Sequence, residues 1–175
     1  MWRTMEQADI PAVTAVSDAV HGRFSERADI YAERLALYPS GCFVLEREGA
    51  LAGYCISHPW RRFTPVPLDR PIGALPERPD SYYLHDIALL PVARGMGASA
   101  RALDFLLAEA GRAGVEEMSL VAVNGADRFW RRCGFEPVED AGVARKLASY
   151  GPGTFYMRRP LDTALRERKQ EQERT

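Results

Sequence analysis

Residues 94–97 form an Arg-Gly-Met-Gly stretch between an apolar, strand-like segment and a long amphipathic pattern that ends at Gly114. The glycines at 95 and 97 remove side chains where the backbone must curl, so several N–H groups can point into one concavity. The dipole of the following helix adds positive potential at the same place. These residues predict a site for a phosphate or pyrophosphate that needs no lysine, with an unliganded strand-to-helix turn as the alternative.

Spacing excludes two other nucleotide-binding patterns. The turn lacks the Gly-Lys-Ser/Thr ending of a P-loop, and the third glycine of a dinucleotide-binding fingerprint is missing. A second segment, Val-Asn-Gly-Ala-Asp-Arg-Phe-Trp-Arg-Arg-Cys-Gly-Phe at 123–135, predicts a short helix closed by Gly134 and Phe135. Asn124 with Asp127 three residues later is typical of a helix cap. We therefore expect Asn124 to cap this helix, a role that can coexist with contact to a ligand.

Together these two segments resemble the GNAT superfamily, the acetyl-CoA-dependent N-acetyltransferases. The resemblance is firmest over residues 82–138 and rests on a Pro-x-x-Arg-Gly-x-Gly turn and an Asn…Ala…Phe…Gly-Phe helix, here Pro91, Arg94, Gly95, Gly97, Asn124, Ala126, Phe129, Gly134 and Phe135. Three positions depart from the family pattern. Ser99 stands where Gly or Ala is usual, and Asn124 is one residue closer to Ala126 than is common. Trp130 replaces the Tyr that often acts as general acid.

The resemblance implies the GNAT fold, a mixed α/β structure. Its central twisted mixed sheet has six to seven strands, with helices on both faces and a V-shaped splay between the fourth and fifth strands. Acetyl-CoA would lie in that splay with its phosphates on the glycine turn, and no metal is expected. The resemblance assigns cofactor binding to the strand, the turn and the short helix: Ile87, Ala88, Leu89, Arg94, Gly95, Met96, Gly97, Ala98, Ser99, Asn124 and Phe129.

Acetyl transfer to an amine needs a base, because an alkyl amine has a pKa of about 10.4 and about one molecule in a thousand is neutral at pH 7. His85 and Asp86, just before the strand residues assigned to the cofactor, are the catalytic candidates. An unperturbed imidazole pKa of about 6.5 suits proton abstraction at neutral pH. Neighbours on a strand point to opposite faces, so only one can face the cleft unless a bulge intervenes. The alternative is that His85 hydrogen-bonds a neighbour and Asp86 caps a loop.

Trp130 is the third catalytic candidate. Its indole N–H can donate a hydrogen bond to a departing sulfur, although it cannot release its proton at accessible pH. The thiolate would then take a proton from solvent; packing under the cofactor is the alternative role of Trp130. Tyr150 and Tyr156 are further candidates for supplying a proton, and the sequence does not rank them. Trp60 opens a proline-rich loop and is the candidate residue for binding the acceptor substrate.

Apolar periodicity and turn signals predict strands at 2–5, 42–47, 51–57, 82–90, 116–123, 135–139 and 153–159. They predict helices at 8–20, 25–38, 95–112 and 125–132, the second of them capped by Ser25. Residues 59–80 contain six prolines and are longer than an ordinary loop that only connects two elements, which favours a functional role for this loop. We interpret His21, between the first two helices, and His58, at the end of the third strand, as structural or exposed.

The composition indicates a single domain over residues 1–160 followed by a polar tail at 161–175. The net charge of -1 provides no electrostatic case for nucleic acid or an anionic membrane. No apolar run suits a membrane span or a signal peptide, so we expect a cytoplasmic protein. The three cysteines lack Cys-x-x-Cys spacing, which indicates neither a disulfide framework nor a zinc site.

We therefore expect an acyltransferase that moves an acetyl group from acetyl-CoA to a primary amine by direct attack. A small-molecule acceptor is favoured over a protein, and homodimerisation is left open. An acyl-enzyme is not expected, because Cys133 has no evident histidine partner. The rival interpretation is a non-catalytic acyl-CoA-binding module with the same fold.

Overall fold

The computed structural model describes residues 1–162 of the chain. Its centre is a seven-stranded sheet in the order β1-β2-β3-β4-β5-β7-β6, antiparallel except for the β4–β5 pair. The strands are β1 Trp2–Thr4, β2 Cys42–Arg47, β3 Ala50–Trp60, β4 Ser81–Leu89, β5 Glu117–Ala122, β6 Glu136–Pro137 and β7 Phe155–Pro160. The α-helices are α1 Ile10–His21, α2 Ala28–Leu37, α3 Ala98–Ala113, α4 Asp127–Arg132 and α5 Ala141–Lys146. This mixed sheet with helices confirms the predicted fold class.

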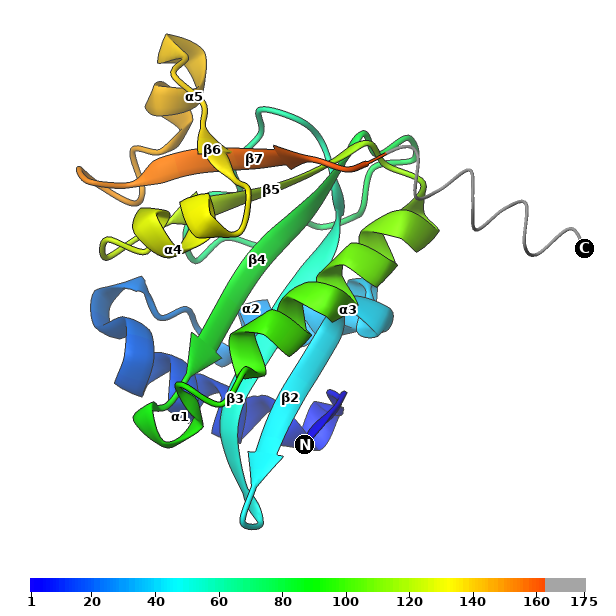
Figure 1. Cartoon of the computed structure of the whole chain (residues 1–175), viewed down its shortest axis with the longest axis vertical. Helices are drawn as coiled ribbons and strands as arrows, with labels where there is room; N and C mark the ends of the chain where they lie inside the picture. The colour runs from blue at the N-terminus through cyan, green and yellow to red at the C-terminus, as the bar shows by residue number, and fades with distance from the viewer. Residues whose placement is uncertain (163–175) are drawn as a thin grey trace, which may run out of the picture.

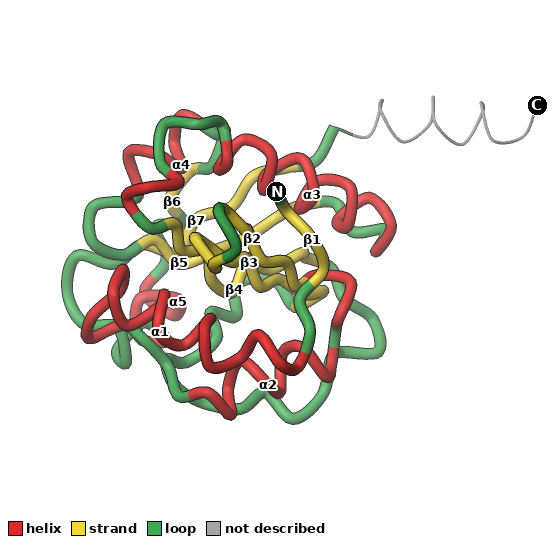
Figure 2. The backbone as a smooth tube through the Cα atoms, turned by 90° about the horizontal axis from the view of Figure 1, so that it is seen from below, coloured by secondary structure: helices red, strands yellow, loops and turns green. Residues whose placement is uncertain are grey.

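Helices cover both faces of the sheet, with α3 and α4 on one side and α1 and α2 on the other (Figure 2). Each face has its own apolar core. Leu106 and Ala110 of α3 pack with Met118 and Leu120 of β5 in one core. Val13 of α1 belongs to a second core with residues of α2, β2 and β3. This two-layer burial fixes the sheet between its helices and holds the strand ends that form the site.

The two central strands β4 and β5 pair over a short length and then part (Figure 1). Their parallel pairing runs from Tyr82–Met118 to Leu84–Leu120, whereas β4 continues to Leu89. On its other edge β4 stays paired with β3 as far as Gly53–Leu89. The last five residues of β4 therefore leave one backbone edge free, as the splay predicted from the family resemblance requires.

Three local predictions need correction. The second helix begins at Ala28 without a side-chain cap, because the Ser25 hydroxyl donates to Asp18 Oδ1 at 2.6 Å instead. The predicted loop between the last two strands contains the helix α5, whose first turn is capped by the Asp140 carboxylate accepting from Val143 N at 2.9 Å. Asn124 does not cap α4, which begins at Asp127 after Ala126 with no side-chain cap. The predicted tail falls almost entirely outside the described residues.

Candidate active site

A cavity of about 410 Å³ lies where β4 and β5 part. Its walls come from the end of α1, the connection to α2, the free part of β4, the start of α3 and the helix α4. Leu68, from the long loop between β3 and β4, and Tyr150, from the connection before β7, close it on the side of α1. The cavity thus borders both Arg94 and Ser99, which flank the glycines of the turn, and a group of ionisable side chains.

The glycine turn has the geometry predicted from its sequence. Gly95 and Gly97 have φ of +74° and +72°, the left-handed region that disfavours side chains, and Gly97 is the N-cap of α3. Nothing lies within 4 Å of a Cβ built on either glycine, so the space beside both residues is open. Arg94 and Ser99 line the cavity, and Arg94 Nε donates to the Leu89 carbonyl at 3.1 Å. Free N–H groups at this helix N-terminus fit a phosphate group.

Other residues assigned to the cofactor surround the same space. Ile87 and Leu89 line the cavity from the free part of β4, while the Ala88 side chain is buried in the core against α1. Asn124 lines it from a turn in which Asn124 itself has a φ of +53°, and Phe129 lines it from α4. Four residues of the turn are not among the lining residues: Gly95, Met96, Gly97 and Ala98. Met96 is largely exposed, and Ala98 is buried with its carbonyl accepting from Trp2 Nε1 at 3.2 Å.

A β-bulge lies at the two candidate base residues. In the β3–β4 register Ile56 faces Asp86, but Ser57 faces Leu84, so His85 is the extra residue. A bulge breaks the alternation of side chains along a strand. His85 and Asp86 consequently both point toward the α1–α2 side, as their partners from that side demonstrate. The sequence left open which one faces the cleft; in the structure both line the cavity.

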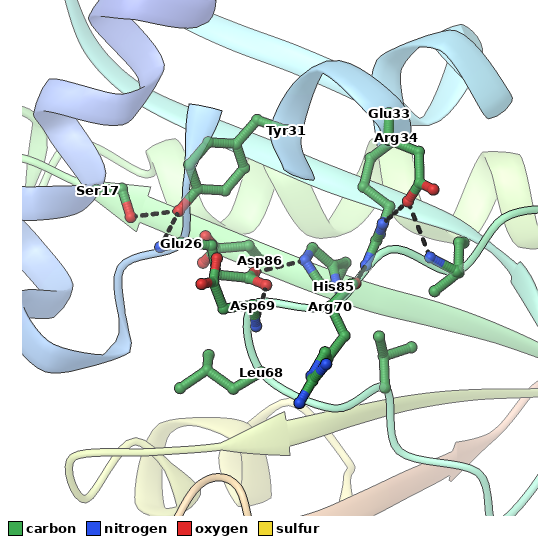
Figure 3. Close-up of polar contacts among 12 residues, drawn as sticks. Ser17, Glu26, Tyr31, Glu33, Arg34, Leu68, Asp69, Arg70, His85 and Asp86 are labelled. Carbon is green, nitrogen blue, oxygen red and sulfur yellow. Dashed lines mark hydrogen bonds and ion pairs between the residues drawn. The ribbon is translucent and has the colours of Figure 1, made fainter. Parts of the chain in front are cut away.

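His85 is paired with Glu26 from the connection between α1 and α2 (Figure 3). His85 Nε2 lies 2.7 Å from Glu26 Oε1, and the two side chains are only 1% and 4% exposed. Glu26 Oε2 accepts from the backbone N–H of Asp69 at 2.8 Å, which ties the long loop to the same carboxylate. His85 Nδ1 is buried and has no hydrogen-bond partner among the described residues.

Asp86 forms a second acid–histidine pair with His21, at the end of α1. His21 Nε2 lies 2.7 Å from Asp86 Oδ1, and the Tyr54 hydroxyl donates to Asp86 Oδ2 at 2.5 Å. Burial is the largest single influence on the pKa of His21 and acts to lower it, but the charge and hydrogen bond of Asp86, together with the Glu26 charge, outweigh burial and the pKa is raised. Burial acts to raise the pKa of Asp86, but the His21 charge and hydrogen bonds hold it lowered. His21, interpreted from the sequence as structural or exposed, therefore belongs to the cavity wall as an ion-pair partner.

Trp130 lines the cavity and also packs in the core. Its side chain is 6% exposed and meets Phe129 and Phe135 edge to face, with ring centroids 4.9 Å and 5.4 Å away. Tyr150 lines the cavity too, but its hydroxyl donates to the Val66 carbonyl at 2.9 Å, and burial raises its pKa far above the usual value. Tyr156 accepts from Phe63 N at 3.0 Å and packs behind the wall.

Trp60 ends β3 instead of opening the loop. Its ring is buried with Val66 and Tyr83, and its Nε1 donates to the Thr64 carbonyl at 2.9 Å. It supports the base of the loop from behind and is not one of the cavity-lining residues in the described part of the chain. The lining residue that the loop does contribute is Leu68.

Sequence reasoning missed Glu26, His21 and Leu68 as site residues. Glu26 and His85 are 59 residues apart, so no local spacing links them. An acidic residue in a helix–helix connection is ordinarily a solvated surface group, so its sequence context does not indicate a role in the site.

Within residues 1–162 there is no group of three or more His, Cys, Asp or Glu side chains that could hold a metal ion. That part of the chain also has no helix long and apolar enough to cross a membrane.

Comparison with known proteins gives a family match and many similar folds. A model of the acetyltransferase (GNAT) family matches residues 9–135. No curated protein sequence matches significantly. The GphF GNAT-like decarboxylase in complex with isobutyryl-CoA superposes with a TM-score of 0.74 at 16% identity, over 93% of this chain and 100% of that one.

Two further similar structures are acetyl-transferring enzymes by name. The ribosomal-protein-S18-alanine N-acetyltransferase from Escherichia coli has a TM-score of 0.62 at 17% identity, over 93% of this chain and 94% of its own. N-acetylglutamate synthase from Neisseria gonorrhoeae, complexed with coenzyme A and N-acetyl-glutamate, has a TM-score of 0.68 at 18% identity, over 93% of this chain and 35% of that one. At such identities these likenesses establish the fold alone.

Proposed function

Because the chain belongs to the GNAT acetyltransferase family, we propose that it transfers the acetyl group of acetyl-CoA to the primary amine of a small molecule by direct attack. The observation that carries this proposal is the free edge of β4 between the open glycine turn and the two acid–histidine pairs. One continuous cavity therefore offers a place for phosphates, an extended backbone edge and a proton acceptor, in the order that the reaction needs.

The chain's own residues fit coenzyme A. N–H groups of the turn at 95–99 would hold the pyrophosphate, with Arg94 beside it. Backbone groups on the free edge of β4, at Ile87 to Leu89, would pair with the amides of the pantetheine arm as an added strand does. Bound there, acetyl-CoA supplies an activated thioester carbonyl. Asn124 and Phe129 would face it from the α4 side of the cavity.

His85 would remove the proton from the acceptor amine, directly or through one water. It lines the cavity, and its Nδ1 has no protein partner in the described structure. We assign the base to His85 and not to His21 because His85 belongs to β4, the strand whose free edge would carry the thioester, whereas His21 lies at the end of α1. We assign Asp86 to holding His21 and Tyr54 at the back of the acceptor space.

Once neutral, the amine nitrogen forms a bond to the carbonyl carbon and the carbon–sulfur bond breaks. Backbone N–H groups near Leu89 would hold the carbonyl oxygen as its negative charge develops. The Trp130 indole N–H can donate to the departing sulfur, which takes its proton from solvent because a thiol has a pKa of about 8.5. Tyr150 is less available as a donor, since its hydroxyl already donates to Val66.

The side chains that line the acceptor side support a small molecule over a protein chain. Leu68 and Tyr150 close that side, and the loop that carries Leu68 is held to α2 and its N-terminal connection by Glu26 and Glu33. A polypeptide substrate would need an open groove in place of these contacts. The ionisable side chains of both acid–histidine pairs line the cavity on this side.

The test is release of coenzyme A from acetyl-CoA with a panel of amines: polyamines, amino acids, aminoglycosides and peptides with free N-termini. We expect thiol release that depends on a small amine, with the acetyl group found on its nitrogen by mass spectrometry. Preferential turnover of peptides would contradict the small-molecule acceptor. Tight binding of coenzyme A without release for any amine would favour the non-catalytic acyl-CoA-binding module.

A further inference from the structure

Glu26 is a buried carboxylate whose two oxygens have two different duties. Oε1 lies 2.7 Å from Nε2 of His85, and Oε2 accepts from the backbone N–H of Asp69 at 2.8 Å. Its side chain is 4% exposed, so neither contact competes with bulk water. Burying a charged group costs free energy of folding unless its hydrogen bonds are made, so both contacts of Glu26 contribute to stability.

The chemistry of these partners sets the position of the proton on His85. An ionised carboxylate only accepts hydrogen bonds, so the nitrogen facing Glu26 must carry hydrogen. A neutral imidazole has one N–H, and with Nε2 protonated its other nitrogen, Nδ1, has the free lone pair. Nδ1 is the His85 nitrogen that has no partner in the described structure.

We propose that Glu26 is a positioning residue for the acetyl transfer: it holds His85 as the Nε2–H tautomer, with Nδ1 as the proton acceptor, while it anchors the loop that closes the acceptor side. This inference rests on the proposed function of His85 as the base. In this proposal the buried Glu26 carboxylate both orients His85 and holds the loop that lines the cavity beside it.

The loop has other anchors that do not touch His85, among them Glu33 (Figure 3). Arg27 donates to both Asp69 carboxylate oxygens, through its backbone N at 2.9 Å and its Nη1 at 2.7 Å. Glu33 accepts from the backbone N–H groups of Ile72 and Gly73 at 2.9 Å and 3.0 Å. Glu33 also pairs with the buried guanidinium of Arg34. It is therefore a control for loop anchoring and for loss of a buried acidic partner, without a contact to the base.

Replacing Glu26 by glutamine should reverse the tautomer of His85. The side-chain amide has one acceptor oxygen, and the Asp69 N–H needs it. The amide NH2 then faces His85 Nε2, which must become the acceptor, so the proton moves to Nδ1. Because glutamine has the shape of glutamate, the loop contact is kept while the free lone pair of the base is lost.

The experiment compares the full-length wild type with Glu26→Gln, Glu26→Asp and Glu33→Gln, using acetyl-CoA and one accepted amine. We expect Glu26→Gln to lower kcat at least about a hundredfold with little change in the KM for acetyl-CoA. Glu26→Asp keeps an accept-only carboxylate and should recover part of that loss. Glu33→Gln should keep kcat within about threefold of the wild type, because it alters the loop contacts and the ion pair with buried Arg34 but no contact of His85.

Imidazole nitrogen NMR supplies a readout that a purely structural role would not move. The wild type and Glu33→Gln should show hydrogen on His85 Nε2, and Glu26→Gln should show it on Nδ1. A wild-type His85 protonated on Nδ1 at neutral charge would overturn the inference, as would near-wild-type kcat in Glu26→Gln or an equal loss in Glu33→Gln. If no amine is turned over by the wild type, the proposed function fails, while the wild-type spectrum still decides the tautomer.

Discussion

Substitutions at Gly97 can separate the strain of the turn from its role in binding phosphate. The residue has a φ of +72°, and nothing lies within 4 Å of a Cβ built there, so alanine adds conformational strain without a clash. Strain of that kind costs about 1 kcal/mol. For a chain of this size it should lower the melting temperature by about 2–4 °C. Gly114, with a φ of +70° and equally open surroundings at the other end of α3, is the matched control.

Gly97→Asp adds a negative charge to the same strain, at the N-terminus that we assign to the pyrophosphate. An acidic side chain at a helix N-terminus is favourable for the protein alone, so the aspartate should be no less stable than the alanine. For acetyl-CoA the same charge is repulsive, and we expect affinity to fall at least tenfold, or about 1.4 kcal/mol. Calorimetric titration with acetyl-CoA, combined with thermal unfolding, measures both effects.

The comparison of variants decides the assignment. Gly97→Ala and Gly114→Ala should lose similar stability, whereas Gly97→Asp should lose binding beyond anything seen with Gly114→Ala. A folded Gly97→Asp protein that binds acetyl-CoA as the wild type does would refute the phosphate site. A matching loss of affinity in Gly114→Ala would show that general destabilisation, not charge, was responsible.

His85→Ala should lower turnover of an accepted amine about a hundredfold or more and flatten the rise of rate with pH near neutrality; an unchanged profile in steady-state kinetics would remove it as the base. Trp130→Phe should reduce kcat at constant acetyl-CoA affinity, with Trp130→Tyr at least as active as Phe, whereas equal turnover in all three proteins would leave Trp130 a packing residue. The pKa of His21 is raised in the folded protein, so its contribution to stability is complete below the unfolded pKa of about 6.5 and is lost as pH rises through the folded pKa. The pKa of Asp86 is lowered in the folded protein, so its contribution is present above the unfolded pKa of about 3.8 and is lost as pH falls through the folded pKa. Urea midpoints of Asp86→Asn should therefore fall furthest below wild type between about pH 4 and 6.5, and a constant difference across pH would argue against the pair. Gly41→Ala should cost about 1–3 kcal/mol in urea unfolding, because its Cβ would lie 2.1 Å from the Ser57 carbonyl oxygen; wild-type stability would contradict the register there.

Short-range signals predicted most of the secondary structure, and the errors arose where contacts from elsewhere competed. Gly114 ends α3 in the left-handed conformation that its glycine predicted. Ser25 lost its expected capping role to a hydrogen bond with Asp18 on the preceding helix. The missed helix α5 is short, and no amphipathic pattern marks it. Its one local signal was Asp140, a residue type typical of helix caps.

The candidate site likewise has one part that local sequence predicted and one part that depends on long-range contacts. The open turn at Gly95 and Gly97 follows from local backbone chemistry, and the structure has the φ angles that the glycines predicted. The partner of the candidate base His85 could not be predicted, because Glu26 lies 59 residues from it in the chain. The same is true of His21 and Asp86, which meet only after α1 packs on the sheet.

The amino-acid sequence by itself determined the family resemblance, the order of the elements other than α5, and the glycine turn that we propose as the phosphate site, since these depend on residue types a few positions apart. Only the tertiary structure decided that His85 and Asp86 share a face. Their shared direction comes from the register of β4 against β3, where Ser57 pairs with Leu84 and the bulge takes up His85. Register is set by how the two strands pack against the cores on both faces of the sheet, a property of the whole fold and not of any segment.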